Sequence, residues 1–406
     1  MKRIVITSMG MLSSIGESTD EHLSSLKTLK SGYKPISRFD TSHAFYRNSN
    51  ACVIDINRLS NICHNDPTLQ INTAIYSIKE VIHSTSISKQ ELANTALIIG
   101  SSIGASQSFS KFYKSYHQEQ KITQEKELEL ASHSTQTIAT EIAKQLSIGG
   151  SLCTISTACS ASTNAVGRAM DMIRSGRTNT VIAGGVDIFT EFAFSGFNCL
   201  QAISPEMCQP FSKQRSGVTL GDASCFFLIE DYDYAKKMGR PILAELMSYH
   251  FFNEAYHPTS LKPDGSSVYF SMKKTLDKAK VSADQVDYIS AHGTATKVND
   301  PTELKGIEQL VQNSAVRDQP LYVSSTKSQI GHCLGAAGAM EIGAIVLGMN
   351  HQFVPANIGS VKSNLIPSQA KIEIPITPIS KKINYALSNS FAFGGNMSSI
   401  LLKSYN

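Results

Sequence analysis

The sequence has little net charge, no long apolar run and no cysteine spacing typical of a zinc site. Its 406 residues carry a formal net charge of +4, which is too small to indicate binding to nucleic acid. The eight cysteines are scattered along the chain, so we expect reduced thiols, no metal site and a cytoplasmic location. No stretch is long and apolar enough to span a membrane. The N-terminal apolar run is broken early, and no convincing cleavage site follows it.

The remaining composition is that of an ordinary globular protein. Hydrophobic residues make up 41% of the chain and charged residues 17%, and the length allows one large core or two similar halves. The polar stretch at 106–134 predicts a solvated cap region. The stretch at 57–69 is also polar, and Arg58 is its one basic residue.

Cys159 stands at a predicted strand-to-helix turn. Residues 152–156 are typical of a short buried strand, and Ser160 and Ser162 suit the cap and first turn of a helix. A sulfur at a helix N-terminus gains from the partial positive charge there, so we expect a lowered thiol pKa. The turn also leaves backbone N–H groups free to hold an oxyanion. Taken alone, however, Cys159 fits an inert buried cysteine equally well.

Two histidines stand in similar positions later in the chain. His292 follows the strand-like residues 286–290 and is followed by Gly293, and His332 follows the strand-like residues 321–326. A single histidine after a strand is more often structural than catalytic. Because one thiol and two imidazoles all follow short β-branched stretches, we interpret them together as an acyl-transfer site.

The whole chain resembles a known family, and four motifs in a fixed order carry this resemblance. They are Thr157-Ala158-Cys159, His292-Gly293-Thr294-Ala295-Thr296, Lys327-Ser328-Gln329-Ile330-Gly331-His332 and Phe393-Gly394-Gly395. The chain resembles a β-ketoacyl-[acyl carrier protein] synthase of the I/II type. The resemblance implies a thiolase-like α/β fold, whose two duplicated halves form a five-layer α-β-α-β-α sandwich. We expect the halves at residues 1–240, which carry the cysteine, and 241–406, which carry both histidines.

The resemblance also implies a decarboxylative Claisen condensation that needs no cofactor. Cys159 would accept an acyl chain, and a malonyl group on an acyl carrier protein would lose carbon dioxide and attack it. His292 and His332 would stabilise the enolate, and the backbone N–H groups of Cys159 and Phe393 would hold the oxyanion. The further residues implied are Lys327 near the histidines, Glu341, Asp300 and Glu303 as supports, Thr294 and Thr296 for the phosphopantetheine arm, and Phe197, Phe391, Phe393, Gly394 and Gly395 for the acyl pocket and its gate.

Several readings stay open at the level of the sequence. Lys327 and Glu341 are equally consistent with an ion pair that only anchors the loop, and Phe197 with an ordinary core residue. Ala392 replaces the usual first glycine of the gate motif, which predicts a stiffer gate.

The partner and the pathway are also open. His332 stands where chain-initiating relatives have asparagine, which favours an elongating enzyme, and the gate loop lacks the second cysteine of thiolases. The polar 57–69 stretch lacks the basic residues with which relatives dock the carrier protein. This scarcity suggests a different docking mode or a partner subunit, and together with the run Phe194-Ser195-Gly196-Phe197-Asn198 it gives the alternative of a specialised polyene or type II polyketide enzyme paired with a chain length factor. A homodimer in fatty acid synthesis stays the rival. A non-catalytic partner subunit is the alternative of another class.

Overall fold

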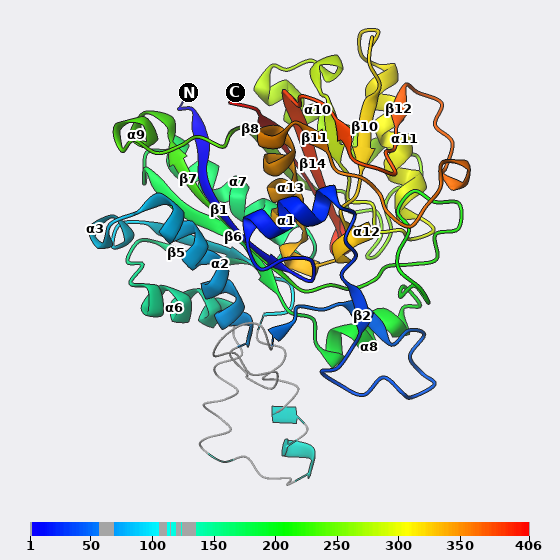
Figure 1. Ribbon diagram of the computed structural model, residues 1–406, viewed down its shortest axis with the longest axis horizontal. Helices are drawn as coiled ribbons and strands as arrows, with labels where there is room; N and C mark the ends of the chain where they lie inside the picture. The colour runs from blue at the N-terminus through cyan, green and yellow to red at the C-terminus, as the bar shows by residue number, and fades with distance from the viewer. Residues whose placement is uncertain are drawn as a thin grey trace.

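The computed structural model describes residues 2–56, 69–104, 112–113, 115–118, 123 and 135–405. Eleven of the described strands form one mixed sheet, in the order β12-β10-β9-β14-β15-β8-β1-β7-β6-β4-β5, and helices cover it (Figure 1). The stretch at 57–68 and most of the predicted cap region at 106–134 lie outside the described residues. The expectations for those two stretches therefore stay predictions.

Apart from the edge strand β12, the sheet consists of two groups of five strands with the same order and the same directions. In the first group β5, β4 and β6 run parallel, and β7 and β1 follow antiparallel. The second group repeats this pattern with β10, β9, β14, β15 and β8. The groups meet where β1 and β8 pair through Val5–Glu245 and Ile6–Ala244. The strands are β1 (Ile4–Ser13), β4 (Ala96–Gly100), β5 (Leu152–Ile155), β6 (Thr180–Asp187), β7 (Ala223–Asp231), β8 (Ala244–Asn253), β9 (Tyr288–Ser290), β10 (Leu321–Ser324), β14 (Tyr385–Ala392), β15 (Asn396–Lys403) and the edge strand β12 (Ile372–Glu373).

Helices lie on both faces of each strand group. In β4, Leu97 and Ile99 join the apolar cluster under α2 and α6, whereas Ile98 between them joins the cluster around α7 and α13. In the second group, Ile289 of β9 packs toward α10 and α11, and Tyr288 packs toward the central cluster. The alternation confirms the predicted five-layer α-β-α-β-α arrangement, with α7 and α13 in the central layer. These helices are α2 (Leu69–Thr85), α6 (Thr135–Leu146), α7 (Ala161–Arg174), α10 (Ser266–Ala279), α11 (Asn299–Gln312) and α13 (Ala337–His351).

The remaining elements are short and connect or cap the layers. The predicted boundary at residue 240 falls between α9 and β8, and the division into 1–240 and 241–406 stays a prediction. Among the described residues, no helix combines the length and apolar character that a membrane crossing needs. The short elements are α1 (Thr19–Lys27), α3 (Lys89–Leu92), α8 (Glu191–Cys199), α9 (Tyr232–Lys237), α12 (Lys327–Ile330), β2 (Tyr33–Pro35), β3 (Asn50–Cys52), β11 (Phe353–Val354), β13 (Ile379–Ser380) and the 3₁₀ turns Ala283–Gln285, Leu334–Ala336, Lys362–Asn364 and Phe393–Gly395.

Candidate active site

Cys159 lies in a tight elbow between β5 and α7, as the sequence predicts. Ala158 has a φ of +50°, an unusual conformation for a residue with a side chain, and Ser160 is the N-cap residue of α7. Ser160 forms no capping hydrogen bond from its side chain, and its hydroxyl donates to the carbonyl of Thr157 at 2.8 Å instead. The backbone thus turns sharply and presents the sulfur, whose residue is 6% exposed.

Contacts from three elements hold this elbow in place. A Cβ at Gly100 would lie 2.3 Å from the backbone nitrogen of Ser162, so only glycine lets the first turn of α7 approach β4 so closely. The Nδ2 of Asn164 donates to Thr157 Oγ1 at 2.8 Å. The hydroxyl of Ser398 in β15 donates to Asn164 Oδ1 at 2.6 Å, which ties the elbow to the second strand group.

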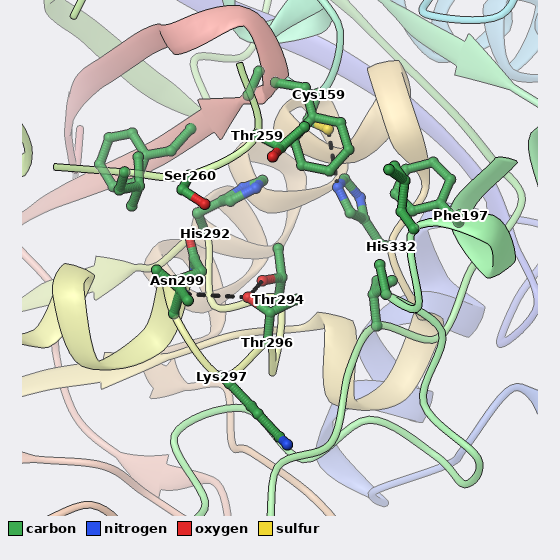
Figure 2. A pocket seen from close by; sticks show the side chains of 18 of the residues that line it. Cys159, Phe197, Thr259, Ser260, His292, Thr294, Thr296, Lys297, Asn299 and His332 are labelled. Carbon is green, nitrogen blue, oxygen red and sulfur yellow. Dashed lines mark hydrogen bonds between the residues drawn. The ribbon is translucent and has the colours of Figure 1, made fainter. Parts of the chain in front are cut away.

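The two histidines lie beside the sulfur (Figure 2). The Nε2 of His332 is 3.1 Å from the Sγ of Cys159, and the rings of His292 and His332 are nearly perpendicular, with centroids 5.3 Å apart. The backbone N–H of Leu334 donates to His332 Nδ1 at 3.2 Å. Because Nδ1 accepts, the proton of the neutral ring is on Nε2, which makes Nε2 a donor toward the pocket.

Lys327 imposes the same tautomer on His292. Its Nζ lies 3.5 Å from His292 Nδ1, so Nδ1 accepts from the ammonium and the ring proton is on Nε2. Lys327 also forms an ion pair with Glu341 of α13, and both side chains are 2% exposed. The ion pair expected from the sequence is therefore present, and the same lysine also contacts a histidine.

Burial and Lys327 together keep both histidines neutral. Burial is the larger cause that lowers the pKa of His292 and of His332 well below the ordinary value, and the charge of Lys327 lowers both further. Burial raises the pKa of Glu341 to about 7, while its partner Lys327 acts in the opposite direction. Lys327 thus disfavours the protonated form of both histidines.

The expected lowering of the Cys159 pKa is wrong. Burial raises the pKa of this thiol to about 12, because a thiolate loses its hydration in the pocket. Lys327 and the backbone N–H groups of Phe393 and of Cys159 itself oppose this rise. The resting cysteine is therefore a neutral thiol.

Glu303 and Asp300, both at the start of α11, hold the backbone that carries His292. The carboxylate of Glu303 accepts from the backbone nitrogens of His292 and Gly293, both at 2.8 Å, and burial raises its pKa to about 7. Asp300 accepts from the backbone nitrogen of Ala295 at 3.0 Å. Both residues are fully buried, so they shape the loop and do not reach the pocket.

Thr294 and Thr296 line the same pocket as the two histidines (Figure 2). Their hydroxyl oxygens are 3.1 Å apart, and Thr296 Oγ1 accepts from the backbone nitrogen of Asn299 at 3.2 Å. The hydroxyl of Thr294 can therefore donate to Thr296 or to a bound polar group.

The aromatic gate residues enclose the sulfur. The rings of Phe197 in α8 and Phe393 are stacked, with centroids 5.7 Å apart, and Phe391 contacts His292 edge-on at 6.1 Å. Ala392 has an extended backbone (φ −118°, ψ 155°) that any residue adopts, so the missing glycine causes no strain in this conformation. Glycine is needed at the next positions, where Gly394 and Gly395 have φ values of 80° and 77°.

One cavity of about 260 Å³ connects these residues to the surface. Of the residues expected from the sequence, it is lined by Cys159, His292, His332, Thr294, Thr296, Phe197, Phe391 and Phe393. The others named as site residues are Lys327, Glu341, Asp300, Glu303, Gly394 and Gly395, which lie behind or beside this lining.

The sequence analysis missed the residues at the mouth and those that support the site from behind. Leu200, Lys297 and Val298 line the cavity, and Asn164 and Asp187 hold the backbone around it. Asp187 had a usable signal, because a charged residue at the end of a buried strand needs buried partners. The residues at the mouth of the cavity had no such signal in the sequence, since they come from separate loops.

The fold and the site define a thiolase-type condensing enzyme: two equivalent strand groups, a cysteine at a helix N-terminus and two neutral imidazoles beside it. Two family models cover most of the chain, "Beta-ketoacyl synthase, N-terminal domain" at residues 1–235 and "Beta-ketoacyl synthase, C-terminal domain" at 243–362. The chain belongs to the beta-ketoacyl synthase family, whose members are condensing acyltransferases.

Curated relatives and solved structures agree with this assignment. The chain is 30% identical to 3-oxoacyl-[acyl-carrier-protein] synthase 2 of Vibrio harveyi in an alignment of 423 positions, gaps included, that covers 99% of this chain and 98% of the relative. It is equally similar to the synthase 2 of Vibrio cholerae, at 30% identity over 99% of both chains. Among solved structures, the ishigamide ketosynthase/chain length factor matches with a TM-score of 0.90 and 28% identity over the full length of both chains.

Proposed function

We propose that this chain is a β-ketoacyl-[acyl carrier protein] synthase in which Cys159 carries the growing acyl chain. In the first stage the thiol of Cys159 attacks an acyl thioester on a carrier protein. The acyl–sulfur bond to the carrier breaks, an acyl–Cys159 bond forms, and the carrier leaves as a free thiol. The N–H groups of Cys159 and Phe393 hold the oxyanion of the tetrahedral intermediate.

In the second stage a malonyl thioester enters and loses carbon dioxide, which leaves an enolate on its thioester. The Nε2–H groups of His292 and His332 donate to the enolate oxygen, where the negative charge develops. The enolate carbon attacks the acyl–Cys159 carbonyl and expels the Cys159 thiolate, which then takes a proton from solvent. The product is a 3-oxoacyl thioester on the carrier, two carbons longer than the acyl group.

One observation carries the proposal: a buried thiol lies within 3.1 Å of an imidazole nitrogen whose tautomer is fixed as a donor. A base would need a lone pair on Nε2, but Nδ1 already accepts the N–H of Leu334, so His332 suits charge stabilisation. The loss of carbon dioxide supplies the carbanion without a proton transfer, which matches a pocket with two donors.

We propose that the reaction uses neither a metal nor an organic cofactor. The ligand-type atoms of Cys159, His292 and His332 lie within 4.8 Å of one another, which would suit a metal ion by distance alone. However, both imidazoles carry their proton on Nε2, and the ammonium of Lys327 repels a cation at this position. Condensation that persists in the presence of a strong chelator would support this part of the proposal.

The mouth of the cavity supports an acidic carrier protein as the partner. Leu200 and Val298, which are 57% and 47% exposed, line the mouth together with Lys297. Arg215 donates to the carbonyl of Lys297 at 3.0 Å, and Arg47 donates to the carbonyl of Gln201, next to Leu200, at 2.9 Å. Two exposed apolar side chains flanked by cations fit an acidic protein that delivers a thioester on a flexible arm.

The test is intact-mass spectrometry of the protein with acyl carrier proteins that carry chains of several lengths and saturations. Wild type is expected to gain the mass of the acyl group in a hydroxylamine-labile form, and Cys159→Ala is expected to gain nothing. If no chain from any carrier modifies wild type, the proposal is wrong for the isolated chain.

A second candidate is the catalytic subunit of a ketosynthase–chain length factor heterodimer that makes a polyene or polyketide. The full-length similarity to the ishigamide ketosynthase/chain length factor favours it. Co-purification separates the two, because a homodimer favours fatty acid synthesis and a paired homologue without the cysteine favours the heterodimer.

A non-catalytic scaffold is the least favoured function, since it needs no ordered thiol–imidazole geometry, and full function in Cys159→Ala would support it. The free thiols of the described residues suit a reducing compartment such as the cytoplasm.

A further inference from the structure

Asp187, the last residue of β6, holds two separate backbone segments, at 102–103 and at 335, with one buried carboxylate. Its side chain is inaccessible to solvent. Oδ1 accepts from the hydroxyl of Ser101 at 2.6 Å, and Oδ2 accepts from the backbone nitrogens of Ser102 at 2.8 Å and Gly335 at 2.6 Å. Further donors to Oδ1 are Gln70 Nε2 at 3.3 Å and the backbone nitrogen of Ile103 at 3.4 Å. Every partner is a donor, so the carboxylate is bound as an anion.

The Gly335 contact leads directly to His332. Gly335 follows Leu334, whose backbone N–H sets the tautomer of His332 by donating to Nδ1 at 3.2 Å. Leu334 has a φ of +50°, a conformation that a leucine keeps only when its surroundings enforce it. The hydrogen bond from Gly335 to Asp187 fixes the peptide that follows this strained residue.

The close approach at Gly335 depends on the absence of a side chain. A Cβ there would lie 2.7 Å from Asp187 Oδ2 and 2.5 Å from the backbone nitrogen of Ser102. Both distances are too short for real contacts, so an alanine would push the loop away from the carboxylate.

We propose that Asp187 is a positioning residue for His332: it anchors Gly335 and so holds the Leu334 N–H against His332 Nδ1, which keeps Nε2–H aimed at the reacting thioester. The role rests on the proposed function, because it matters for catalysis only if His332 stabilises the enolate. Asp187 acts through the backbone and does not line the cavity.

Asp187→Asn tests this role by separating the two half-reactions. The amide lacks the negative charge that strengthens the hydrogen bond from Gly335, and it loses that bond where its N–H₂ group faces Gly335, so the 334–335 peptide is held less tightly. We expect decarboxylation of malonyl-[acyl carrier protein] to fall about 10- to 100-fold, the loss typical of a misplaced catalytic group. Acylation of Cys159 from a small acyl thioester is expected to fall much less, because it uses the thiol and the oxyanion N–H groups.

The thiol gives a second readout, which applies to a variant whose thermal unfolding matches that of wild type, because a loss of structure would also expose the thiol and lower its pKa. Two charged groups act on the pKa of the Cys159 thiol from outside its own elbow, with Lys327 lowering it and Asp187 raising it. Removal of the Asp187 charge is therefore expected to shift the pH profile of Cys159 alkylation toward lower pH, so that the thiol becomes easier to alkylate while the decarboxylation slows.

Gly335→Ala breaks the same contact from the other side and keeps the carboxylate. It should reproduce the slow decarboxylation without the shift in the alkylation profile, and the double variant should be no slower than either single variant. Asp287→Asn is the matched control, since Asp287 also accepts a backbone N–H, from Asn384 at 2.7 Å, but precedes β9 at the end of that strand opposite His292.

The outcomes separate the two hypotheses. If wild type neither acylates nor decarboxylates, the proposed function fails. If wild type is active and Asp187→Asn slows both half-reactions equally, or if the effects of Asp187→Asn and Gly335→Ala add, the positioning role is wrong. Thermal unfolding of each variant identifies any that lose the fold, and the variant that stays folded decides the test.

Discussion

The Nε2 of His332 lies 3.1 Å from the Sγ of Cys159, and that nitrogen carries the proton. The resting pair is therefore a neutral donor beside a neutral thiol, with no thiolate–imidazolium character. Since burial also raises the pKa of Cys159 to about 12, the thiol and both imidazoles are uncharged before substrate arrives. It holds donors where charge will develop, which is the arrangement expected for enolate chemistry.

His332→Ala is expected to separate decarboxylation from acylation. Loss of one donor to the enolate should slow the release of carbon dioxide from malonyl-[acyl carrier protein] about 100- to 1,000-fold, or about 2.7–4 kcal/mol in the barrier. Acyl transfer to Cys159 should persist, because its oxyanion is held by backbone N–H groups. Rapid decarboxylation in His332→Ala would contradict the role given to this ring.

Lys327→Met is expected to reduce both stability and activity, because it leaves the buried Glu341 without its ion-pair partner. The free energy of unfolding should fall by about 3–5 kcal/mol, measured by urea denaturation. The double variant Lys327→Met/Glu341→Gln should recover most of the stability, since no unpaired charge remains, but not the activity. If the double variant also recovers the activity, the pair only anchors the loop.

The sequence predicts the fold and the residues of the pocket far better than it predicts their electrostatics. The motifs around Cys159, His292 and His332 specify the family, and the strand-to-helix turn at Cys159 follows from local patterns. The raised pKa of the thiol does not, because it results from burial in a pocket whose lining residues are distant in sequence. Asn164 carries no such local signal for its contact with Ser398 of β15, whereas the charge of Asp187 at the end of a buried strand was a signal that could have been used. The catalytic roles themselves stay predictions.

We expect the buried ring of His22 in α1 to lower the stability of the protein in mild acid. Burial lowers its pKa from 6.5 to about 4, and the ring is held between the Ser13 hydroxyl and the Ser18 carbonyl, each at 2.8 Å. Below pH 6.5 the His22 ring binds a proton in the unfolded chain but stays neutral in the folded chain. The free energy of unfolding therefore falls between pH 6.5 and about 4. The loss is on the order of 3 kcal/mol, from about 2.5 pH units at 1.36 kcal/mol each.

The comparison with His22→Gln isolates this contribution, since other buried groups also titrate in this range. Urea midpoints at pH 7 and pH 4.5 should differ less in the variant than in wild type. An equal difference in both proteins would mean that His22 does not carry the acid sensitivity.

Lys297→Glu at the mouth is expected to weaken the use of carrier-borne substrates. Reversal of one rim charge should lower kcat/KM for acyl carrier protein about 10-fold at low salt, with a smaller effect at high salt. Acylation of Cys159 from a small thioester should be unchanged, because that substrate makes no contact with the rim. Lys237→Glu on α9 is the control for net charge. Equal losses in both variants would contradict docking at this rim.

Phe197→Ala is expected to change which acyl chains Cys159 accepts. The Phe197 ring stacks on Phe393 at 5.7 Å and lines the cavity beside the sulfur, so its removal opens space next to the thioester carbon and frees the Phe393 ring. In competition between carriers loaded with short and long chains, intact-mass analysis should show a shift toward longer chains. Acylation as a whole should slow several-fold, because a looser Phe393 holds its oxyanion N–H less well.

Phe192→Ala is the matched control, since Phe192 lies on the same helix and is 65% exposed. If both variants keep the wild-type preference, Phe197 is an ordinary packing residue and the chain length is set elsewhere in the molecule.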